Sequence, residues 1–456
     1  MMAAFPSGRQ VELCCKQPFF EGMSPSCSAL LMLYHHSLPL IAQSQREDTR
    51  PNWAEISLSA LRHNFRTVQK HVGAGVTICA VVKCDGYGHG AAGCAAALVQ
   101  EGASWFGVTS TDEGVWLRDA GIDAHVLVLT GCWRGEEEDL LRYRLTPAVF
   151  RVEDCEALVR AAERLQLRKR IPVHLKIDTG MARLGLPREE VDDFAERVRR
   201  LPQIELEGVF SHLASAEVSD AEDARLQSVR FGLAVRMLDA HGLRAPLRHL
   251  ANSSAAIGRP ETWHTMVRPG IALYGYELPI TLRDGSPAPE APQLPLKPAL
   301  CWKARVINLR DVPAGQALGY GGTYVTPKPA RIATVPVGYG DGFSRRMSYG
   351  LATLDACREA SLKRPSSGSD AAAVECRTPA VLLRGMRAPI LGRISMDLTL
   401  VDVSHIAGVE IGDEVTLVGR SGDHRITAWD HARWSDTVVY ETLCNLSERV
   451  PRRFVE

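Results

Sequence analysis

The chain has 456 residues, of which 45% are hydrophobic and 23% are charged, an ordinary globular composition in a chain long enough for two domains. Lysine plus arginine and aspartate plus glutamate each total 53, so the net charge is zero and no basic field attracts nucleic acid or an anionic membrane. We therefore expect a small-molecule partner, and neither a nucleic acid nor a membrane.

Cysteine usage and hydropathy indicate the compartment. The 12 cysteines are scattered along the sequence without a C-x-x-C pair, which argues against a zinc ribbon and against a dense disulfide framework. The sequence contains no run of about 18 apolar residues, so we expect no transmembrane helix. These features together predict a cytoplasmic protein without a metal site.

The N-terminal 50 residues lack regular patterning, and we expect residues 1–50 to form a poorly ordered extension. The hydrophobic pattern changes at Trp53–Ile56, a strand-like segment that precedes an amphipathic helix over Ser59–Val72. Ser59 is the residue that we expect to cap this helix, because a serine hydroxyl can accept a hydrogen bond from the first helical turn.

Repeated β-α units follow. Eight apolar or β-branched runs are candidate strands: Val76–Val82, Trp105–Thr109, His125–Thr130, Pro147–Phe150, Pro172–Ile177, Glu205–Ser211, Leu247–Ala251 and Met266–Leu273. Helix-like segments lie between most of them, for example Ala91–Glu101, Val152–Glu163, Arg188–Arg200 and Ala221–Ala240. Eight such units predict an α/β fold, a TIM (β/α)8 barrel over residues 51–289. The doubly wound alternative normally has fewer strands, and no G-x-G-x-x-G follows the first strand to favour it.

A change of pattern after Tyr276 indicates a second domain. Pro/Gly-rich turns alternate there with short strand-like runs such as Trp302–Asn308, Ala330–Val337 and Glu414–Val418, which are typical of antiparallel β-structure. We therefore expect a mostly β C-terminal domain over residues 290–456. Within it, residues 349–378 are polar and Ser-rich and are expected to form an exposed insertion.

Lys83 ends the first of the eight runs and enters a loop that contains Gly86, Gly88 and Gly90. In a TIM barrel such a position lies at the C-terminal rim, where active sites are found. Glycines let backbone amides approach a ligand closely, and Tyr87 adds a hydroxyl, so the loop suits a phosphate-bearing cofactor. A solvated lysine in a flexible turn is the alternative at this point.

Polar residues also follow the later strands. They are Lys176, Asp178, Arg183, His212, Asn252, Ser253 and Arg268. If the barrel closes, these side chains surround one cavity and supply cations and donors for an anionic, carbonyl-bearing ligand. Independent placement on the surface is the alternative.

Four motifs of the second domain place an aromatic or polar residue beside turn residues. They are Leu318–Tyr324, Val337–Gly342, Gly392–Asp397 and Val439–Glu441. Any one of them alone is explained as a hairpin turn, whereas the four together favour a functional surface.

Three segments carry a resemblance to a known family. Ala80–Gly90 reads AVVKCDGYGHG, Lys176–Gly185 reads KIDTGMARLG and Val267–Gly275 reads VRPGIALYG. With these motifs in order, residues 51–456 resemble the alanine racemase family of pyridoxal-phosphate enzymes. The chain departs from the usual pattern at Cys84, where alanine is common, and at Ala182, where glycine is usual, and it loses no catalytic group by doing so.

The resemblance implies a homodimer in which the C-terminal domain of each subunit completes the other subunit's site, so that Tyr320 and Met396 act there. It implies that Lys83 carries pyridoxal 5'-phosphate and serves as one base, with Tyr320 as the second. His212 supports Tyr320 in a relay that reaches Arg268, which faces the pyridine nitrogen. The other cofactor-binding residues that it implies are Tyr87, Asn252, Ser253, Gly270, Ile271 and Tyr440.

For the substrate, the resemblance implies that Arg183 holds a carboxylate or a cofactor oxygen and that Met396 and Tyr339 line the inner pocket. Lys176 orients Arg183. In this family the lysine at this position is often carbamylated, which converts a like charge into a carboxylate partner. An unmodified lysine aided by a bound anion is the alternative, because two adjacent cations repel each other.

The implied activity is that of an isomerase, an alanine racemase that interconverts L-alanine and D-alanine and supplies D-alanine for peptidoglycan. Its two-base mechanism requires one base on each face of the Cα atom. A broad-specificity or serine racemase with the same machinery is the nearest alternative. A decarboxylase is disfavoured because Arg268, rather than an acidic residue, matches the ring-nitrogen position. A non-enzymatic cofactor carrier is disfavoured because the chain continues beyond residue 290.

Overall fold

A computed structural model describes residues 50–348 and 378–456. The N-terminal extension expected over residues 1–50 and the insertion expected over residues 349–378 lie outside the described residues, apart from Arg50 and Thr378. From Pro51 onward, the described residues form one compact unit. No helix in the described ranges combines the length and the apolar character needed to cross a bilayer.

Within the described residues, eight parallel strands follow one another in the order β10-β2-β3-β4-β5-β6-β8-β9, which confirms the predicted barrel. Their bounds are β2 Thr77–Val81, β3 Trp105–Val108, β4 His125–Val128, β5 Thr146–Val149, β6 Ile171–Asp178, β8 Ile204–Phe210, β9 Leu247–His249 and β10 Met266–Val267. The short strand β7, Leu186–Pro187, pairs with the end of β6. A bond from the Arg268 amide to the Ala251 carbonyl, 3.0 Å long, links the two end strands of this order just beyond their last paired residues.

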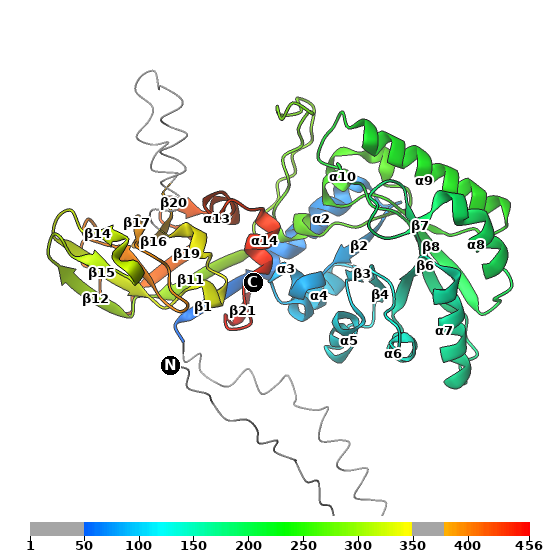
Figure 1. The fold of residues 1–456 in the computed structure, drawn as a ribbon, viewed down its shortest axis with the longest axis horizontal. Coiled ribbons are helices and arrows are strands. Elements are labelled where there is room, and N and C mark those ends of the chain that lie inside the picture. The colour runs from blue at the N-terminus through cyan, green and yellow to red at the C-terminus, as the bar shows by residue number, and fades with distance from the viewer. Residues whose placement is uncertain (1–49, 349–377) are drawn as a thin grey trace, which may run out of the picture. The chain divides into compact units, whose positions relative to one another are not determined.

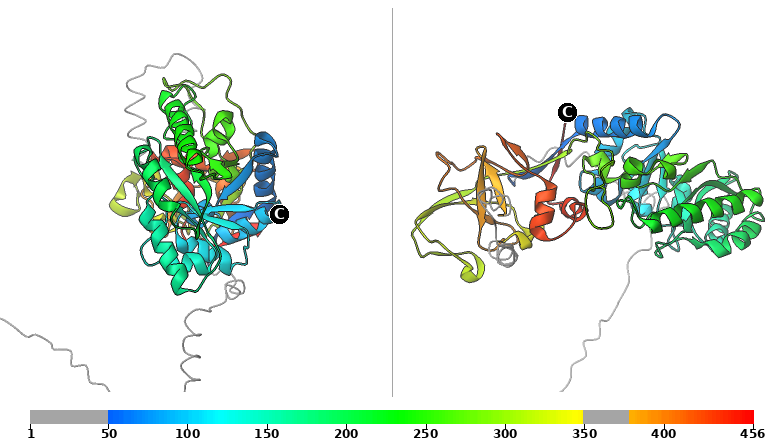
Figure 2. Two further views of the ribbon diagram at one scale, coloured as in Figure 1. Left: turned by 90° about the vertical axis from the view of Figure 1, so that its right-hand side faces the viewer. Right: turned by 90° about the horizontal axis from the view of Figure 1, so that it is seen from above.

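The helical segments of this domain lie around the barrel strands, most of them on the outside (Figure 1), and the left view of Figure 2 shows the strands surrounded by them. They are α2 Leu58–Val72, α3 Lys83–Tyr87, α4 Ala91–Gln100, α5 Thr111–Asp119, α6 Glu137–Arg142, α7 Val152–Arg164, η2 Arg188–Glu190, α8 Val191–Val198, α9 Glu222–Ala240, α10 Ser253–Gly258, η3 Pro260–Thr262 and η4 Ile271–Tyr274. The prediction that Ser59 caps the first helix is wrong. Ser57 caps α2 by accepting from the Ala60 amide at 3.1 Å, because the preceding strand ends there with extended backbone.

The first strand, β1 Asn52–Ser57, pairs with strands of the second domain although it precedes the barrel in sequence. It runs antiparallel to β11, Leu300–Arg305, and parallel to β21, Arg452–Val455. A buried bond from the Trp302 indole to the Asn52 side chain, 2.7 Å long, reinforces this pairing. The chain therefore begins its compact unit in the β domain and returns to that domain after the barrel.

The C-terminal domain is mostly β, as predicted. Its main sheet has the order β12-β15-β18-β17-β16-β19-β11-β1-β21, and β20 pairs with β19. The remaining bounds are β12 Asn308–Val312, β13 Ala317–Leu318, β14 Tyr324–Val325, β15 Ala330–Val335, β16 Ala380–Leu383, β17 Met386–Leu391, β18 Thr399–Asp402, β19 Glu414–Ser421 and β20 His424–Ile426. Its helices are η5 Tyr320–Gly322, η6 Tyr339–Asp341, η7 Arg345–Met347, α13 Ala428–Ser435 and α14 Val439–Cys444. Helix α14 packs against α3 of the barrel.

Candidate active site

Lys83 lies two residues after the end of β2, where the chain begins a left-handed turn. The four residues Cys84–Tyr87 all have positive φ, between 50° and 63°. Such backbone costs about 1–2 kcal/mol for each residue other than glycine, so the surroundings must hold it. The Glu113 carboxylate accepts from the Cys84 amide at 2.6 Å, and Asp85 accepts from the Ala91 amide at 2.8 Å. These bonds hold the half-buried Lys83 at the C-terminal rim of the barrel.

Tyr87 forms the centre of an aromatic cluster beside Lys83. Its ring centroid lies 5.1 Å from that of Tyr274 and 6.1 Å from that of Tyr440, which comes from α14 of the C-terminal domain. Burial raises the pKa of Tyr87 and keeps its hydroxyl protonated as a donor. Burial likewise raises the pKa of Tyr440 to about 12. Both hydroxyls are therefore neutral donors at physiological pH.

Ser253, Gly270 and Ile271 lie together near Tyr87. The Ser253 hydroxyl accepts from the Gly270 amide at 2.9 Å, and the preceding residue, Asn252, caps α10 by accepting from the Ala255 amide at 3.1 Å. Ser253 and Ile271 each begin a helical segment, and the first amides of a helix have no carbonyl partner within that helix. Amides, a serine hydroxyl and a tyrosine hydroxyl are the donors that a phosphate group requires.

Arg268 is buried within the barrel and held by hydrogen bonds. Its Nη1 donates to the His249 ring at 2.9 Å, and its Nη2 donates to the Ser211 carbonyl at 2.7 Å and faces the His212 ring at 3.4 Å. The Nε–H has no hydrogen-bond partner among the described residues. Burial lowers the pKa of Arg268 to about 10, so the guanidinium remains charged at neutral pH.

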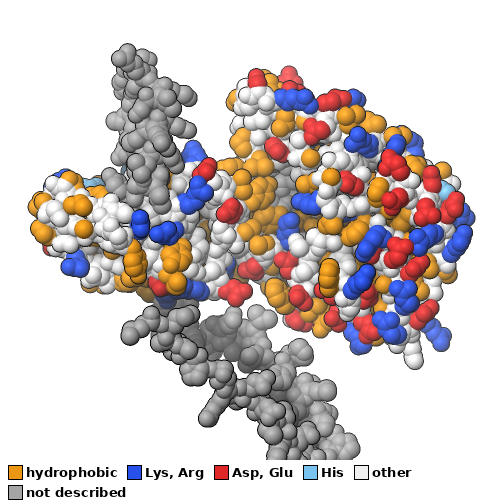
Figure 3. All heavy atoms as spheres, in the orientation of Figure 1, with side chains coloured by type: hydrophobic (Ala, Val, Ile, Leu, Met, Phe, Trp, Pro, Cys, Tyr) orange, Lys and Arg blue, Asp and Glu red, His pale blue; other side chains and the backbone are white. Residues whose placement is uncertain are grey.

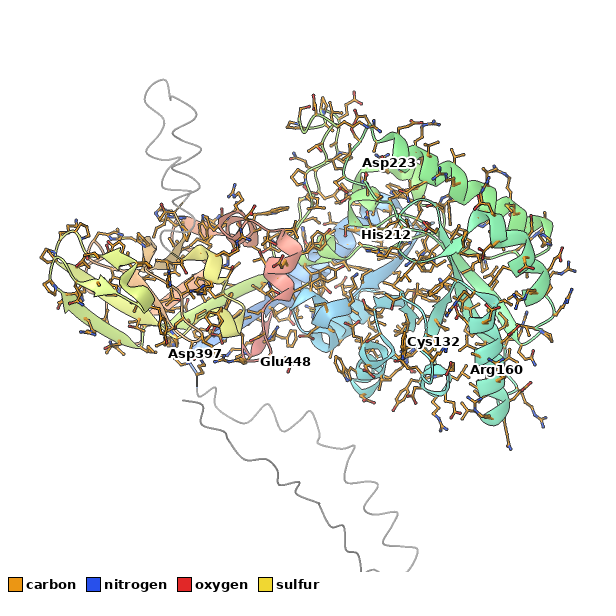
Figure 4. The ribbon with its side chains drawn as sticks, viewed as in Figure 1. Cys132, Arg160, His212, Asp223, Asp397 and Glu448 are labelled. Carbon is orange, nitrogen blue, oxygen red and sulfur yellow. The ribbon has the colours of Figure 1, made fainter. Side chains whose placement is uncertain are left out.

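Lys176 and His212 share the cationic environment of Arg268. Burial and the charges of Arg268, Arg183 and Lys83 lower the pKa of Lys176 to about 8. Burial and the same cations, with Arg268 foremost, lower the pKa of His212 to about 3, which keeps this imidazole neutral. Figure 4 shows His212 among the elements of the barrel. The positive charges of this cluster therefore favour the binding of an anion.

Arg183 is presented at the rim by a loop that follows β6. The Asp178 carboxylate accepts from the amides of Gly180, Met181 and Ala182, at 2.9, 3.1 and 3.2 Å. Ala182 has φ of +55°, a conformation that glycine adopts more readily. The resulting turn leaves Arg183 exposed next to the cluster, although its charge reaches both Lys176 and His212.

Three of the predicted site residues lie apart from the barrel cluster. Tyr320 on η5 is 71% exposed, Met396 is 52% exposed and Tyr339 on η6 is 43% exposed. In the part of the chain that the structure describes, no hydrogen bond or ring contact joins any of them to Lys83. Figure 4 labels Asp397, the neighbour of Met396, on the C-terminal domain. The structure therefore brings Tyr440, but not these three, to the barrel site of the same chain.

Sequence reasoning did not single out several residues that shape this site. His249 contacts Arg268, and Glu113 binds the turn after Lys83 and also accepts from the Thr109 amide at 2.6 Å. The Tyr274 hydroxyl donates to the Val81 carbonyl at 3.2 Å. A histidine inside an apolar strand was a signal that could have identified His249, whereas no local signal distinguishes Glu113.

Possible metal ligands and surface charge are two further features of the described residues. Among residues 50–348 and 378–456, no three His, Cys, Asp or Glu side chains are grouped to hold a metal ion. Figure 3 shows Lys, Arg, Asp and Glu side chains interspersed on the face that it displays, in keeping with equal totals of 53 basic and 53 acidic residues.

Comparisons with known proteins cover nearly all of the compact unit. The family "Alanine racemase, N-terminal domain" matches residues 56–278, and "Alanine racemase, C-terminal domain" matches residues 299–454. The alanine racemase of Symbiobacterium thermophilum is 41% identical over 404 residues, which are 88% of this chain and 97% of that protein. That of Carboxydothermus hydrogenoformans is 40% identical over 408 residues, 89% of this chain and 100% of that protein.

Solved structures give the same result. The alanine racemase of Clostridium difficile 630 superposes with a TM-score of 0.76 at 31% identity, covering 89% of this chain and 96% of that one. An alanine racemase of Bartonella henselae with covalently bound pyridoxal phosphate has a TM-score of 0.72 at 26% identity, covering 89% of this chain and 99% of that one.

Proposed function

Because this chain belongs to the alanine racemase family, we propose that it is a pyridoxal-phosphate-dependent isomerase that interconverts L-alanine and D-alanine. The observation that carries the proposal is the environment of Arg268. Its buried guanidinium is fixed at both terminal nitrogens and has an Nε–H without a partner among the described residues. Its charge and that of Lys83 both act on Lys176. We further propose that the enzyme supplies D-alanine for peptidoglycan in the cytoplasm.

The residues present fit the cofactor. Lys83 would carry it at the rim, Arg268 would donate its Nε–H to the pyridine nitrogen, and Tyr440 and Tyr87 would meet the phosphate group. The remaining phosphate contacts would come from Asn252, Ser253, Gly270 and Ile271. The Tyr87 hydroxyl approaches Gly270 where any Cβ would obstruct it, which supports a cradle shaped for close contact. When bound, pyridoxal phosphate supplies an electron sink that acidifies the Cα proton of an amino acid.

Arg268 determines what kind of reaction the site favours. An arginine with a pKa of about 10 is a permanent donor that does not give its proton to the ring nitrogen at neutral pH. Arg268 would thus leave the ring nitrogen without a proton, whereas an acidic partner would protonate it, and this would favour rapid return of the proton to Cα. This argues for racemisation over decarboxylation.

Two bases on opposite faces of Cα complete the proposed mechanism. The Lys83 amine would exchange the proton on one face, and the Tyr320 hydroxyl of the other subunit would exchange it on the second face. The 71% exposure of Tyr320 supports a role outside its own subunit. A homodimer with shared sites is therefore part of the proposal, with the exposed Met396 and Tyr339 lining the substrate pocket.

His212 is suited to support Tyr320. Arginine only donates hydrogen bonds, so the neutral His212 ring presents its bare Nδ1 to Arg268 and carries its hydrogen on Nε2. That Nε2–H can donate to the tyrosine oxygen and stabilise its deprotonated form. The relay thus lowers the cost of proton transfer from or to Tyr320.

Arg183 would hold the substrate carboxylate, oriented by Lys176. With a pKa of about 8, Lys176 exists partly as a neutral amine, the form that reacts with carbon dioxide to give a carbamate and a proton. A carbamate would face Arg183 as a carboxylate partner, and a bound anion beside unmodified Lys176 is the alternative. Either supplies the negative charge that this cluster of cations favours.

The proposal is tested by incubating the protein with pyridoxal phosphate and L-alanine and measuring D-alanine by chiral chromatography. We expect D-alanine to form until both enantiomers are equal, and the reverse from D-alanine. A parallel incubation with L-serine tests the alternative of a broad-specificity or serine racemase. Cofactor binding without any change in either amino acid would reject the proposal in favour of a cofactor carrier.

A further inference from the structure

Arg268 is the first member of a chain of buried polar groups that runs away from the site through the barrel. Its Nη1 lies 2.9 Å from Nδ1 of His249, whose Nε2 lies 2.9 Å from Nδ1 of His174. The Nε2 of His174 faces the Glu207 carboxylate at 3.6 Å. Both imidazoles are fully buried.

Arg268 and Glu207, at the two ends of this series of polar groups, determine the direction of its hydrogen bonds. Burial lowers the pKa of His249 and of His174, so both rings are neutral and carry one hydrogen each. Arg268 only donates, so His249 accepts at Nδ1 and carries its hydrogen on Nε2. His174 then accepts at Nδ1 and directs its own Nε2–H at the carboxylate of Glu207, which only accepts.

The pairing of strands β6 and β8 brings His174 and Glu207 together. In the pairing of β6 with β8, Val173 is opposite Leu206 and His174 is opposite Gly208, so Glu207 is an extra, bulged residue. A bulge turns a side chain out of the regular alternation, and here it brings Glu207 to His174. A Cβ on Gly208 would lie 2.4 Å from Nδ1 of His174, so only glycine leaves room for this ring.

The two facing atoms have no other bond. Nε2 of His174 and one carboxylate oxygen of Glu207 are both buried and lack a hydrogen-bond partner among the described residues. Buried polar atoms in proteins are almost always partnered, and a shift of a few tenths of an ångström would close the 3.6 Å separation between them. The Glu207 carboxylate is therefore the acceptor available to His174.

We propose that Glu207 and His174 are positioning residues, which act together with Arg268 to hold one tautomer of His249, the tautomer that presents a bare Nδ1 to Arg268. This inference rests on the proposed function in one respect, the contact of Arg268 with the cofactor ring. If the chain lost its acceptor end, the imidazole hydrogens could reverse, and His249 would direct an N–H at an arginine that can only donate. Arg268 would then move from its position.

The test compares Glu207→Leu, which removes the acceptor, with Glu207→Gln, whose amide oxygen can still accept. Glu205→Leu is the matched control, because Glu205 is exposed on the same strand two residues earlier. The cofactor-loaded proteins, labelled with 15N in histidine, are compared by NMR of the ring nitrogens, with His174→Gln used for assignment. The kcat and KM for alanine are measured on the same samples.

We expect the wild-type protein to hold His174 and His249 as single Nε2–H tautomers, and Glu207→Gln and Glu205→Leu to preserve them. Glu207→Leu should mix the tautomers and lower kcat about tenfold with little change in KM. Unchanged tautomers in folded Glu207→Leu would overturn the inference, as would Nδ1–H forms in the wild-type protein. If the wild-type protein racemises no amino acid while its tautomers respond to Glu207→Leu, the proposed function fails and the positioning role stands.

Discussion

The Tyr87 hydroxyl and the Gly270 backbone approach so closely that a Cβ at position 270 would lie 2.3 Å from the hydroxyl oxygen. Since Tyr87 is buried, its ring cannot simply swing away from an added methyl group. The contact joins the turn after Lys83 to the segment after β10, the two parts of the proposed phosphate cradle. It makes position 270 a direct test of that cradle.

Gly270→Ala should weaken cofactor binding about tenfold or more, because overpacking a filled site costs about 1–3 kcal/mol. The affinity is measured by titrating the cofactor-free protein with pyridoxal phosphate and following its visible absorbance. Gly75→Ala serves as the control, since nothing lies within 4 Å of a Cβ at that position. Equal affinities for the two variants would exclude Gly270 from the cradle.

Lys83→Ala should abolish racemisation and the visible absorbance of the covalently held cofactor. The physical reason is that the strained turn fixes Nζ of Lys83 at the end of β2, whereas the neighbouring amine of Lys176 lies on a different strand, β6. The exposed Lys70→Ala on α2 is the control and should behave as the wild type. A Lys83→Ala protein that keeps both properties would refute the assignment.

Tyr320→Phe should retain the cofactor but slow proton removal from L-alanine by about 10²–10⁴-fold, the usual contribution of a positioned acid or base. Deuterium exchange at Cα in heavy water, measured from each enantiomer, resolves the two faces. Tyr143→Phe, at the C-terminal end of α6, is the control. Equal and unimpaired exchange from both enantiomers would eliminate the two-base mechanism.

Lys176→Met should stabilise the protein at pH 7 in carbon-dioxide-free buffer by about 1–3 kcal/mol, because burial and neighbouring cations penalise the lysine charge. The folded-state pKa, about 8, lies below the unfolded value of 10.5, so the unfolded chain binds the proton more tightly. The penalty is therefore complete below pH 8 and disappears as the pH rises toward 10.5. Urea unfolding of both proteins at pH 7 and pH 10 checks this; a constant difference would contradict the assigned pKa.

The barrel was predictable because its strands are continuous apolar runs separated by amphipathic helices, a pattern that sequence shows directly. The partners of β1 were not predictable. Trp53–Ile56 has the pattern of a strand, but nothing in it identifies β11 and β21, hundreds of residues away, as its neighbours. The residue that caps the first helix was also mispredicted. Ser57 and Ser59 are the same residue type, and the end of the preceding strand decides which of them caps α2.

The candidate site also contains residues that could be predicted from the sequence and residues that could not. Lys83, Arg183 and Arg268 follow strands and carry recognisable motifs, so sequence could propose them. The buried chain from His249 to Glu207 depends on a bulge and on the absence of a side chain at Gly208, and both are properties of strand pairing that no single segment encodes. Long-range register, rather than residue type, is what the sequence left undetermined.

Mixing the two inactive variants Lys83→Ala and Tyr320→Phe tests the central claim, a racemase site shared between two subunits. Half of the randomly reassembled dimers would be mixed, and each mixed dimer would hold one site with both groups intact, so about one quarter of the wild-type rate of D-alanine formation should return. If both bases came from one chain, no site would be complete. A mixture no more active than the two variants measured separately would therefore contradict the account.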